Sequence, residues 1–444
     1  MQTLSGTISP LDDRYRDKLT EVREIFCESS LARARCLIEI SHCVRLHPIF
    51  SEPTQNQIFD AYSLLENFND EDFLRIKQIE STVKHDVKAV ELFLREKLTF
   101  DNPNRIHFGL TSEDVNNLAW STLFNTFKNT LHVKRLKSVM SSLLFLCKEW
   151  KTIPFPARTH GQLATPTTAG KEMAVYLNRL ARPLSSIANH RFHGKLNGAT
   201  GTYAAMLVAA PYFDWVTHEK NVLRELGLDR NSATTQIDDC GSLCQYLDHV
   251  RTVNNILIDL CQDIWMYVSY GYLVQRVVKH EVGSSTMPHK INPINFENAE
   301  GNLQLSGALL GFMTDKLSKS RMQRDLSGST VMRNVGVALA HHYLALLQLE
   351  EGLSKVSLDA DKCASELESH SELLSEALQT ILRTQSNEDV YDQVKNATRG
   401  KESNSVKNLL ERNGVNLRVT KYTGYSSRIC DDVINETEQL LSTL

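Results

Sequence analysis

Long helical periodicity constrains the fold of this chain more than any other feature. Apolar residues recur at steps of three and four from about 243 to 279, and a similar pattern runs from Thr111 to about Trp150 with at most one break. The second pattern is about three times as long as the mean globular helix of ~12 residues, and such helices typically form bundles. Strand-like alternation of any length is missing from the sequence. The sequence therefore predicts an all-α bundle of long helices.

Shorter helical patterns occupy the N-terminal part of the chain. One follows Asp12 or Asp13, either of which can cap it, and runs to Leu46, which would place Arg14 and Tyr15 in its first turn. Residues 71–98 form a second pattern, which predicts one amphipathic helix of about 25 residues that includes His85 and Asp86.

Two changes along the chain suggest domain boundaries. The turn-forming residues 101–104 interrupt the helical pattern, and from about Ser354 the sequence becomes more polar and its helices shorter. We therefore expect three domains, namely an N-terminal helical domain over 1–104, a central long-helix bundle over 105–353, and a small C-terminal helical domain over 354–444.

Composition excludes several classes of protein. The 444 residues include 41% hydrophobic and 23% charged residues, which is ordinary for a globular chain, and the net charge of −4 gives no basic excess for binding nucleic acid. Nine cysteines without CxxC pairs suggest reduced thiols, and Cys240 and Cys244 lack further ligands at metal spacing. With no leader-like N-terminus and no apolar run near the ~20 residues of a membrane span, we expect a cytoplasmic protein with no membrane partner.

A polar loop over residues 283–293 follows the long helical pattern, and helical spacing then resumes from Ile294 to about Leu317. Proline disfavours helix at the residue before it, whereas Asn292 is a good N-cap and Pro293 suits a first helical position. The loop should therefore end at a helix N-terminus, where free N–H groups and the helix dipole favour anions. A carboxylate or phosphate site and a solvated connection are both compatible with this pattern.

Other polar clusters also lie at breaks between helices. Residues 111–114, Thr-Ser-Glu-Asp, form a capping signal for the helix that follows. Residues 158–162 carry His160 on irregular backbone just before a helix expected to start at Thr165–Pro166, which makes it the first acid/base candidate among the histidines. A further cluster, which suits either an anion or plain surface charge, consists of Arg324, Ser329 and Arg333.

These clusters resemble the motifs of a known family. Residues 283–293 match the pattern GSSxMPxKxNP, which is typical of the fumarase/aspartase superfamily of fumarate-releasing lyases, at every specified position. Within it, nearly the whole chain resembles the adenylosuccinate lyase family. Further motifs that carry this resemblance are Asp13–Tyr15, Lys84–Glu91, Thr111–Asp114, Arg158–Gln162, Thr234–Gln236, Gln323–Asp325 and Ser329–Arg333. Lys84 departs from the pattern, which has a short polar residue such as Asn or Arg there, so its contact is open.

The resemblance implies an all-α, three-domain subunit of the fumarase/aspartase type. Its central helices would form the core of a homotetramer, with each active site built from three subunits. The implied substrates are two small molecules, adenylosuccinate and the succinyl-carboxamide ribotide SAICAR, both of which would release fumarate. No metal or organic cofactor is expected, because the substrate's own carboxylate can accept the electron pair.

The resemblance also implies the roles of individual residues. Ser284 would be the base, His160 the general acid, and Glu297 would orient His160. Lys290 would hold the charge that develops on the substrate. The implied substrate-binding residues are Arg14, Tyr15, Lys84, His85, Asp86, Thr111, Ser112, Gln236, Ser285, Ile291, Asn292, Asn298, Arg324, Ser329, Thr330, Val331, Met332 and Arg333.

Two alternatives remain at this point. Another lyase of the superfamily, such as one acting on argininosuccinate, would share the loop over 283–293. A non-catalytic structural homologue could have lost its acid and base, yet His160 and Ser284 are both present.

Overall fold

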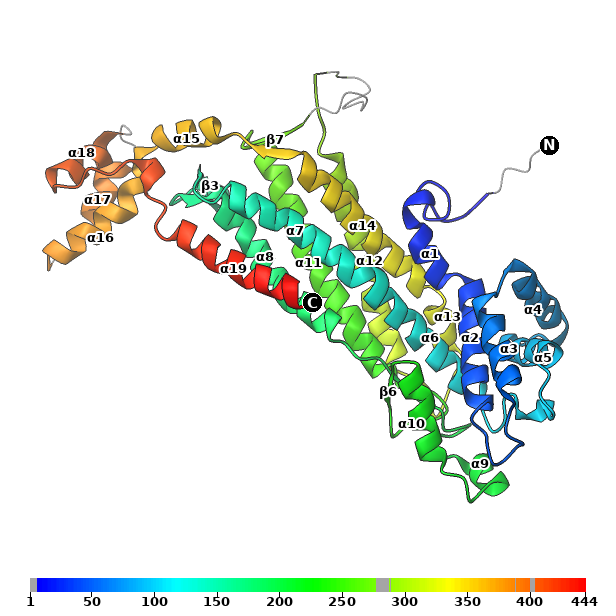
Figure 1. The fold of residues 1–444 in the computed structure, drawn as a ribbon. Coiled ribbons are helices and arrows are strands. Elements are labelled where there is room, and N and C mark those ends of the chain that lie inside the picture. The colour runs from blue at the N-terminus through cyan, green and yellow to red at the C-terminus, as the bar shows by residue number, and fades with distance from the viewer. Residues whose placement is uncertain (1–5, 277–286, 288, 388, 400–403) are drawn as a thin grey trace. The chain divides into compact units, whose positions relative to one another are not determined.

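The computed structural model describes residues 6–276, 287, 289–387, 389–399 and 404–444, and nearly all of its regular structure is helical (Figure 1). The predicted all-α class is confirmed. The chain forms two compact units, each assembled from separate stretches. Unit 1 comprises Met1–Arg135, Ser186–Asn254 and Gln304–Leu344, and unit 2 comprises Leu136–Ser185, Asn255–Leu303 and Ala345–Leu444. The three-domain division over 1–104, 105–353 and 354–444 stays a prediction.

The long helices expected from the periodicity are present, but the helical pattern expected from 243 to 279 ends early. The helix stops at Ser269, just before Gly271 with its left-handed φ of 75°, and residues 273–275 form a strand. Backbone of helical type runs from Ser112 to Glu149 with a single π-helical interruption at η3 (Lys128–His132), and α12 has the bounds that the periodicity predicts. Helices with residues in both units are α7 (Val133–Glu149), α8 (Ala169–Ala188), α11 (Gly241–Ser269), α12 (Ile294–Leu317) and α14 (Val335–Lys355).

Unit 1 packs α2 against α3, α4 and α5, as Figure 1 shows in blue. Side chains start these helices: Thr54 forms a capping box before α3, and Asn69 accepts two backbone N–H groups before α4. Between them lies a core of fully buried apolar residues that includes Ile40 and Phe93. These four helices are α2 (Glu28–Cys43), α3 (Gln55–Glu66), α4 (Asp70–Val83) and α5 (Asp86–Lys97). The other elements that lie wholly in unit 1 are η1 (Asp17–Leu19), α1 (Thr20–Phe26), η2 (Pro103–Arg105), α6 (Ser112–Phe127), the parallel pair β5 (His193–Gly194) and β6 (Asp229–Arg230), α9 (Ala204–Ala209), α10 (Trp215–Glu225) and α13 (Ser327–Met332).

Two helix predictions for unit 1 are wrong in their bounds. The helix expected over 71–98 is two helices, because Lys84 adopts a left-handed conformation with φ of 57° and His85 is extended before α5. The single helix expected from residue 12 to residue 46 is divided as well. Cys27 is extended between α1 and α2, and the residues before Asp17 form turns.

Unit 2 holds three short antiparallel pairs and a helical C-terminal part. The helix predicted at Thr165 starts at Ala169 instead, because Thr167–Thr168 pairs with Pro154–Phe155 as β4 with β1. Buried leucines and valines, among them Leu378 and Leu410, form the C-terminal core. The other elements are β2 (Arg158–Thr159), β3 (Gln162–Leu163), β7 (Leu273–Gln275) paired with β8 (Val356–Leu358), α15 (Ala360–Glu368), η4 (Ser371–Leu374), α16 (Ser375–Gln385), α17 (Tyr391–Thr398), α18 (Asn404–Arg412), η5 (Val419–Lys421) and α19 (Ser426–Thr443).

Within the described residues, no helix combines the length and apolar content needed to cross a membrane. The nine cysteines are all free thiols, and most of them are buried. Burial raises the pKa of Cys244 to about 11, so this residue packs as a neutral thiol.

Candidate functional site

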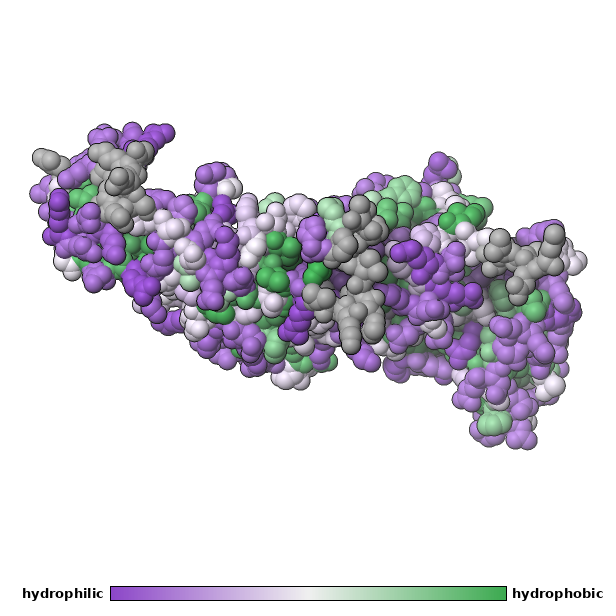
Figure 2. All heavy atoms as spheres, turned by 90° about the horizontal axis from the view of Figure 1, so that it is seen from above, coloured by the Kyte–Doolittle hydropathy of each residue, from purple (hydrophilic) through white to green (hydrophobic). Residues whose placement is uncertain are grey.

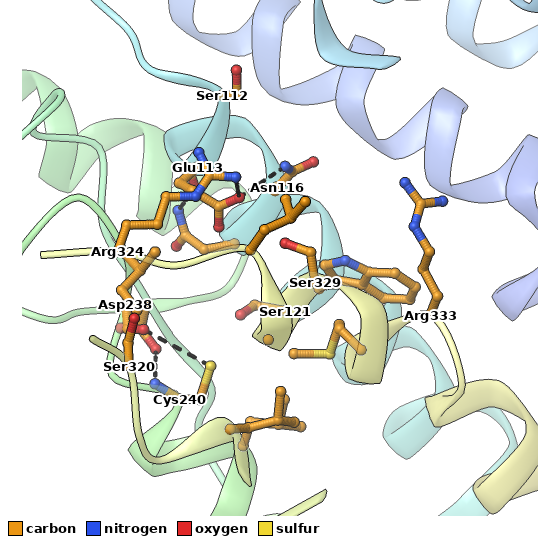
Figure 3. Close-up of a pocket in the computed structure, with 18 of the residues that line it drawn as sticks. Ser112, Glu113, Asn116, Ser121, Asp238, Cys240, Ser320, Arg324, Ser329 and Arg333 are labelled. Carbon is orange, nitrogen blue, oxygen red and sulfur yellow. Dashed lines mark hydrogen bonds and ion pairs between the residues drawn. The ribbon is translucent and has the colours of Figure 1, made fainter. Parts of the chain in front are cut away.

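A cavity of about 370 Å³ lies in unit 1 beside α6, and Figure 3 draws part of its lining. Its walls come from five stretches of the sequence: helix α2, the junction of α4 and α5, helix α6, the segment leading into α11, and α13 with the loop before it. Helix α6 forms one wall because its lining residues recur at steps of three and four, which places them on one face. These residues are Ser112, Glu113, Asn116, Asn117, Trp120, Ser121 and Phe124.

The α4–α5 junction brings Lys84, His85 and Asp86 to the cavity. The backbone N–H of Lys88 donates to His85 Nδ1 at 3.2 Å, so the neutral imidazole carries its proton on Nε2. That N–H donates to Ser112 Oγ at 3.4 Å. The helix break that sequence periodicity did not predict is therefore what turns three motif residues toward the site.

Asp86 is held between two arginines. Its carboxylate accepts from Arg35 at 2.7 Å and from Arg333 at 3.0 Å. Burial acts to raise the pKa of Asp86, but Arg35, the backbone N–H of Val87 and Arg333 outweigh burial and lower it. Arg333 is 50% exposed, so its guanidinium can also present N–H donors to an anionic ligand.

Arg324 connects Gln236 with α6. Its guanidinium donates to Gln236 Oε1 at 3.2 Å and pairs with Glu113 at 2.9 Å, and Figure 3 shows it reaching toward Glu113. Thr235 Oγ1 adds a bond to the carbonyl of Gln323 at 2.9 Å. Because Gln236 accepts through its amide oxygen, its amide nitrogen remains a donor for a ligand.

Asp325 starts the turn into α13. The hydroxyl of Ser327, with the backbone N–H groups of Arg321 and Ser327, holds the pKa of the Asp325 carboxyl below its usual range. The residues of α13 and its end that line the cavity are Gly328, Ser329, Met332 and Arg333, while Thr330 and Val331 are not among its lining residues.

The Thr111–Asp114 motif forms the predicted capping box at the start of α6. The Thr111 backbone N–H donates to Asp114 Oδ2 at 2.9 Å. Asp114 is fully buried beside Lys195, 2.9 Å away. Burial raises the pKa of Asp114, against the opposing effect of Lys195 and backbone N–H donors.

Two residues of this region escaped the sequence analysis. Arg35 and Lys195 are nearly or fully buried cations whose partners lie far along the chain. The one available signal was an arginine within the apolar pattern of α2, where a charge needs a partner.

His160 lies in unit 2 at the tip of the β2–β3 hairpin, with an exposed side chain. His160 and Gly161 have φ of 53° and 75°, as expected for a two-residue turn of the hairpin type. The base of the hairpin is fixed by Arg158, which pairs with Glu366 at 2.8 Å and donates to Tyr272 Oη at 2.9 Å. The predicted irregular backbone at His160 is confirmed.

Glu297 and Asn298 lie in the first turns of α12 in unit 2. Glu297 is exposed, and its Oε1 accepts from Trp265 Nε1 at 3.1 Å. Among the described hydrogen bonds, none joins Glu297 to His160, so the predicted orientation of His160 by Glu297 stays a prediction.

The loop over 283–293 is described at residue 287 and from 289 onward. Its last residues lead into α12, which begins at Ile294 directly after Asn292 and Pro293. The side chains of Lys290 and Ile291 are exposed, and that of Asn292 is half-buried. Two residues with predicted roles, Ser284 and Ser285, lie outside the described residues.

Arg14 and Tyr15 lie in the turns before η1 and do not line the cavity. Arg14 is exposed, with its guanidinium 5.8 Å from the centroid of the Tyr15 ring. In the part of the chain that is described, no three His, Cys, Asp or Glu side chains are grouped as metal ligands would be.

Comparisons with known proteins identify the family. The Lyase family model matches residues 13–305, and the Adenylosuccinate lyase C-terminal model matches residues 320–422. The chain is 40% identical over 414 residues to the adenylosuccinate lyase of Haemophilus influenzae, with 90% of each chain covered, and 41% identical over 408 residues to that of Vibrio cholerae, with 89% of each covered.

Solved structures show the fold. The chain is similar to a fumarate lyase from Mesorhizobium sp. BNC1, with a TM-score of 0.77, 19% identity and coverage of 94% of this chain and 97% of that one. It is also similar to the 3-carboxy-cis,cis-muconate lactonizing enzyme from Pseudomonas putida, with a TM-score of 0.79, 17% identity and coverage of 95% and 97%. The fold is therefore the all-α fumarase/aspartase fold that the sequence predicts. On its sequence relatives, the chain belongs to the adenylosuccinate lyase family.

Proposed function

We propose that this chain catalyses the β-elimination of fumarate from adenylosuccinate to give AMP, and by the same chemistry from SAICAR to give AICAR. One observation carries the proposal beyond family membership: motif residues from three separate stretches, 84–86, 112–113 and 324–333, line one cavity in unit 1. They place Arg324, Ser329 and Arg333 near His85 and Ser112. Cationic and hydroxyl donors in one concave site suit a ligand with a phosphate and carboxylates.

The reaction needs three actions, and the residues supply candidates for each. Ser284 takes the proton from the succinyl carbon next to a carboxylate, and the electron pair delocalises into that carboxylate. The C–N bond then breaks, and His160 protonates the leaving nitrogen. Lys290 and Gln236 stabilise the charge that develops on the carboxylate. The carboxylate itself is the electron sink, so the step balances without a cofactor.

We propose that the acid and base act in a homotetramer whose sites combine residues of three subunits. The exposure of His160, Lys290 and Glu297 supports this, because an acid or base works best where water is excluded. Large apolar side chains are also exposed on the long helices, and Figure 2 shows hydrophobic patches among polar residues on the face that it presents. Such side chains, which suit a subunit interface, are Phe145, Val175, Trp265, Met266, Leu305 and Phe312.

The test is release of fumarate by the purified protein. Adenylosuccinate, SAICAR and argininosuccinate are supplied separately, and fumarate formation is followed by absorbance and by mass spectrometry. We expect turnover of the first two substrates and none of the third. Turnover of argininosuccinate alone would replace the proposed activity with that of another lyase of the superfamily, and no turnover of any substrate would support a non-catalytic homologue.

A further inference from the structure

The ammonium group of Lys195 is buried, and all three of its N–H groups have acceptors. Its side chain is 0% exposed, and Nζ lies 2.9 Å from Asp114 Oδ1, 2.9 Å from the Gly198 carbonyl and 2.8 Å from the Gln236 carbonyl. An ammonium has three N–H donors, and each has one acceptor here. Such a group fixes the relative positions of all three acceptors.

The Asp114 carboxylate is ionised in this arrangement. Besides Lys195, it accepts from the backbone N–H groups of Thr111 at 2.9 Å, Asn197 at 3.1 Å and Gly198 at 3.1 Å. A protonated carboxyl would lose an acceptor site to its own hydrogen, so four donors require the anion. The pair thus joins the start of α6, which carries Thr111 and Ser112, to the loop after β5.

Side-chain hydrogen bonds hold the segment that carries Gln236 in place. Among the described residues, 232–239 make no backbone-to-backbone hydrogen bond and belong to no helix or strand. Asn197 Nδ2 donates to Thr234 Oγ1 at 2.8 Å, and Lys195 Nζ holds the carbonyl of Gln236 itself. Lys195 is therefore the residue that connects Gln236 to the Thr111–Ser112 turn.

We infer that Lys195, with Asp114, is a positioning residue for the elimination: it sets the Gln236 amide and the Ser112 hydroxyl at the spacing that the succinyl carboxylates require. This inference rests on the proposed function. Lys195 touches no reacting atom. It acts through Gln236 and through the α6 N-terminus, where a shift of about 1 Å can lower a rate a hundredfold.

The experiment compares two buried lysines of unit 1. Lys195→Met alone leaves the buried Asp114 charge without its cation, so the main variant is Lys195→Met with Asp114→Asn, which removes both charges at similar volume. The matched control is Lys128→Met. Lys128 is also buried and donates to the carbonyls of Ala188 and His190, but it contacts none of the candidate site residues.

We measure kcat and KM for adenylosuccinate, the dissociation constant of AMP, and the folded fraction by circular dichroism. For the double variant we expect kcat/KM to fall at least about tenfold at equal folded fraction, with AMP affinity within about threefold of wild type, because AMP lacks the succinyl group. Lys128→Met should keep the wild-type kcat/KM per folded subunit.

Three outcomes would count against the inference. Wild-type kcat/KM in the folded double variant would overturn the inference. An equal loss of kcat/KM in Lys128→Met would also overturn it, because the loss would then be a general effect of removing a buried lysine. A double variant that does not fold even at low temperature would show that the pair is structural, which also overturns it. A wild-type chain that releases no fumarate would instead overturn the proposed function, so the two failures are distinguishable.

Discussion

At the residue scale, Asp86 is the charged residue of the cavity that forms ion pairs with two arginines. Because Arg35 is nearly buried, loss of the carboxylate between it and Arg333 leaves a cation without its anionic partner. We expect Asp86→Asn to lower the free energy of unfolding at pH 7 by about 2 kcal/mol, the range for a hydrogen bond between charged groups. Urea denaturation at a fixed protein concentration measures this.

The stability that Asp86→Asn loses should depend on pH, which gives a second test of the same ion pair. The pKa of Asp86 is lowered in the folded chain, so its contribution is present above the ordinary carboxyl pKa of 3.8 and is lost as the pH falls through the folded value. The difference between wild type and Asp86→Asn should therefore shrink below about pH 4. A difference that stayed constant into acid would mean that the ion pair is not its source.

At this scale the sequence pointed to several residues that line the cavity, but not to the contacts that hold them there. Motif resemblance pointed to Lys84, His85 and Asp86, and the structure brings them to the cavity. It could not predict Arg35 or Lys195, because a buried cation is paired by tertiary packing, and nothing in the local sequence specifies a partner far along the chain.

At the scale of elements, the loop between β5 and α9 packs its glycines against other backbone. A Cβ on Gly201 would lie 2.3 Å from the carbonyl oxygen of Thr234, two residues before Gln236. We expect Gly201→Ala to displace that segment, lower kcat/KM at least about tenfold and cost about 2 kcal/mol of stability through overpacking.

The control separates overlap from backbone strain. Gly414 has a similar φ of 77°, but nothing lies within 4 Å of its added Cβ. Gly414→Ala should therefore cost only the left-handed conformation, about 1 kcal/mol, and keep wild-type turnover. Equal behaviour of the two variants in kinetics and thermal unfolding would exclude displacement of the Thr234 segment.

A buried hydrogen-bond chain connects α11, η3 and α14 in unit 1. Asn254 Oδ1 accepts from His342 Nδ1 at 2.6 Å, His132 Nε2 lies 2.9 Å from His342 Nε2, and Tyr246 Oη lies 2.7 Å from His132 Nδ1. An amide oxygen can only accept, so His342 carries its proton on Nδ1 and His132 donates from Nε2. His342 is therefore neutral, since its Nε2 accepts, and burial favours the neutral form of His132 as well.

The neutral pair predicts acid-labile packing of these helices. Burial lowers the pKa of His342 to about 3, and burial, with the neighbouring His342, also holds the pKa of His132 well below its ordinary value of 6.5. Because the pKa values of both histidines are lower in the folded chain than in the unfolded chain, their contribution to the free energy of unfolding is fully present above pH 6.5. It is lost as the pH falls toward the folded pKa values. Each histidine should add a slope of at most about 1.4 kcal/mol per pH unit to the free energy of unfolding.

Urea denaturation between pH 7 and pH 5 tests this slope. The double variant His132→Leu/His342→Leu should be less stable at every pH, since Tyr246 and Asn254 each lose a hydrogen bond to a histidine, but its slope should be shallower. His47→Asn, which changes an exposed histidine, should keep the wild-type slope. A steep slope in the double variant would place the acid sensitivity elsewhere.

Sequence periodicity predicted the uninterrupted helix α12 correctly, but it missed a helix break across which the apolar repeat continues. The bounds of α12 follow from its spacing and its Asn-Pro start. The α4–α5 break was missed because Ile79, Val83, Val87 and Val90 continue the apolar repeat across it, while the break depends on the left-handed backbone of Lys84. A lysine gives no sequence signal for such a conformation, which Gly, Asn and Asp adopt more often.

At the scale of the whole molecule, the predicted acid and base lie far apart in the sequence, and in an oligomer they can come from different subunits. His160 stands on an exposed hairpin tip, and family resemblance assigns Ser284 to the loop before α12. Neither the periodicity nor the motifs of one chain specify how subunits meet, since that depends on complementary surfaces of separate copies. Sites shared between subunits are therefore a question for mixed oligomers.

Two inactive variants can answer it together. His160→Ala and Ser284→Ala should each lower kcat by about two orders of magnitude or more while the subunits stay folded. If the two residues of one site come from different subunits, random mixing leaves both intact in about a quarter of the sites, so the mixture should recover activity toward that fraction of wild type. Turnover is measured after subunit exchange, which mass spectrometry of isotopically labelled subunits verifies.

The controls decide what a recovery means. A double variant with both substitutions in every subunit, mixed with either single variant, has no site in which both residues can be restored, so it should stay inactive. Mixing without exchange should also give nothing. If verified hybrids remain as inactive as the single variants, His160 and Ser284 act from the same subunit, and the proposal of shared sites fails even if fumarate release by the wild-type chain is established.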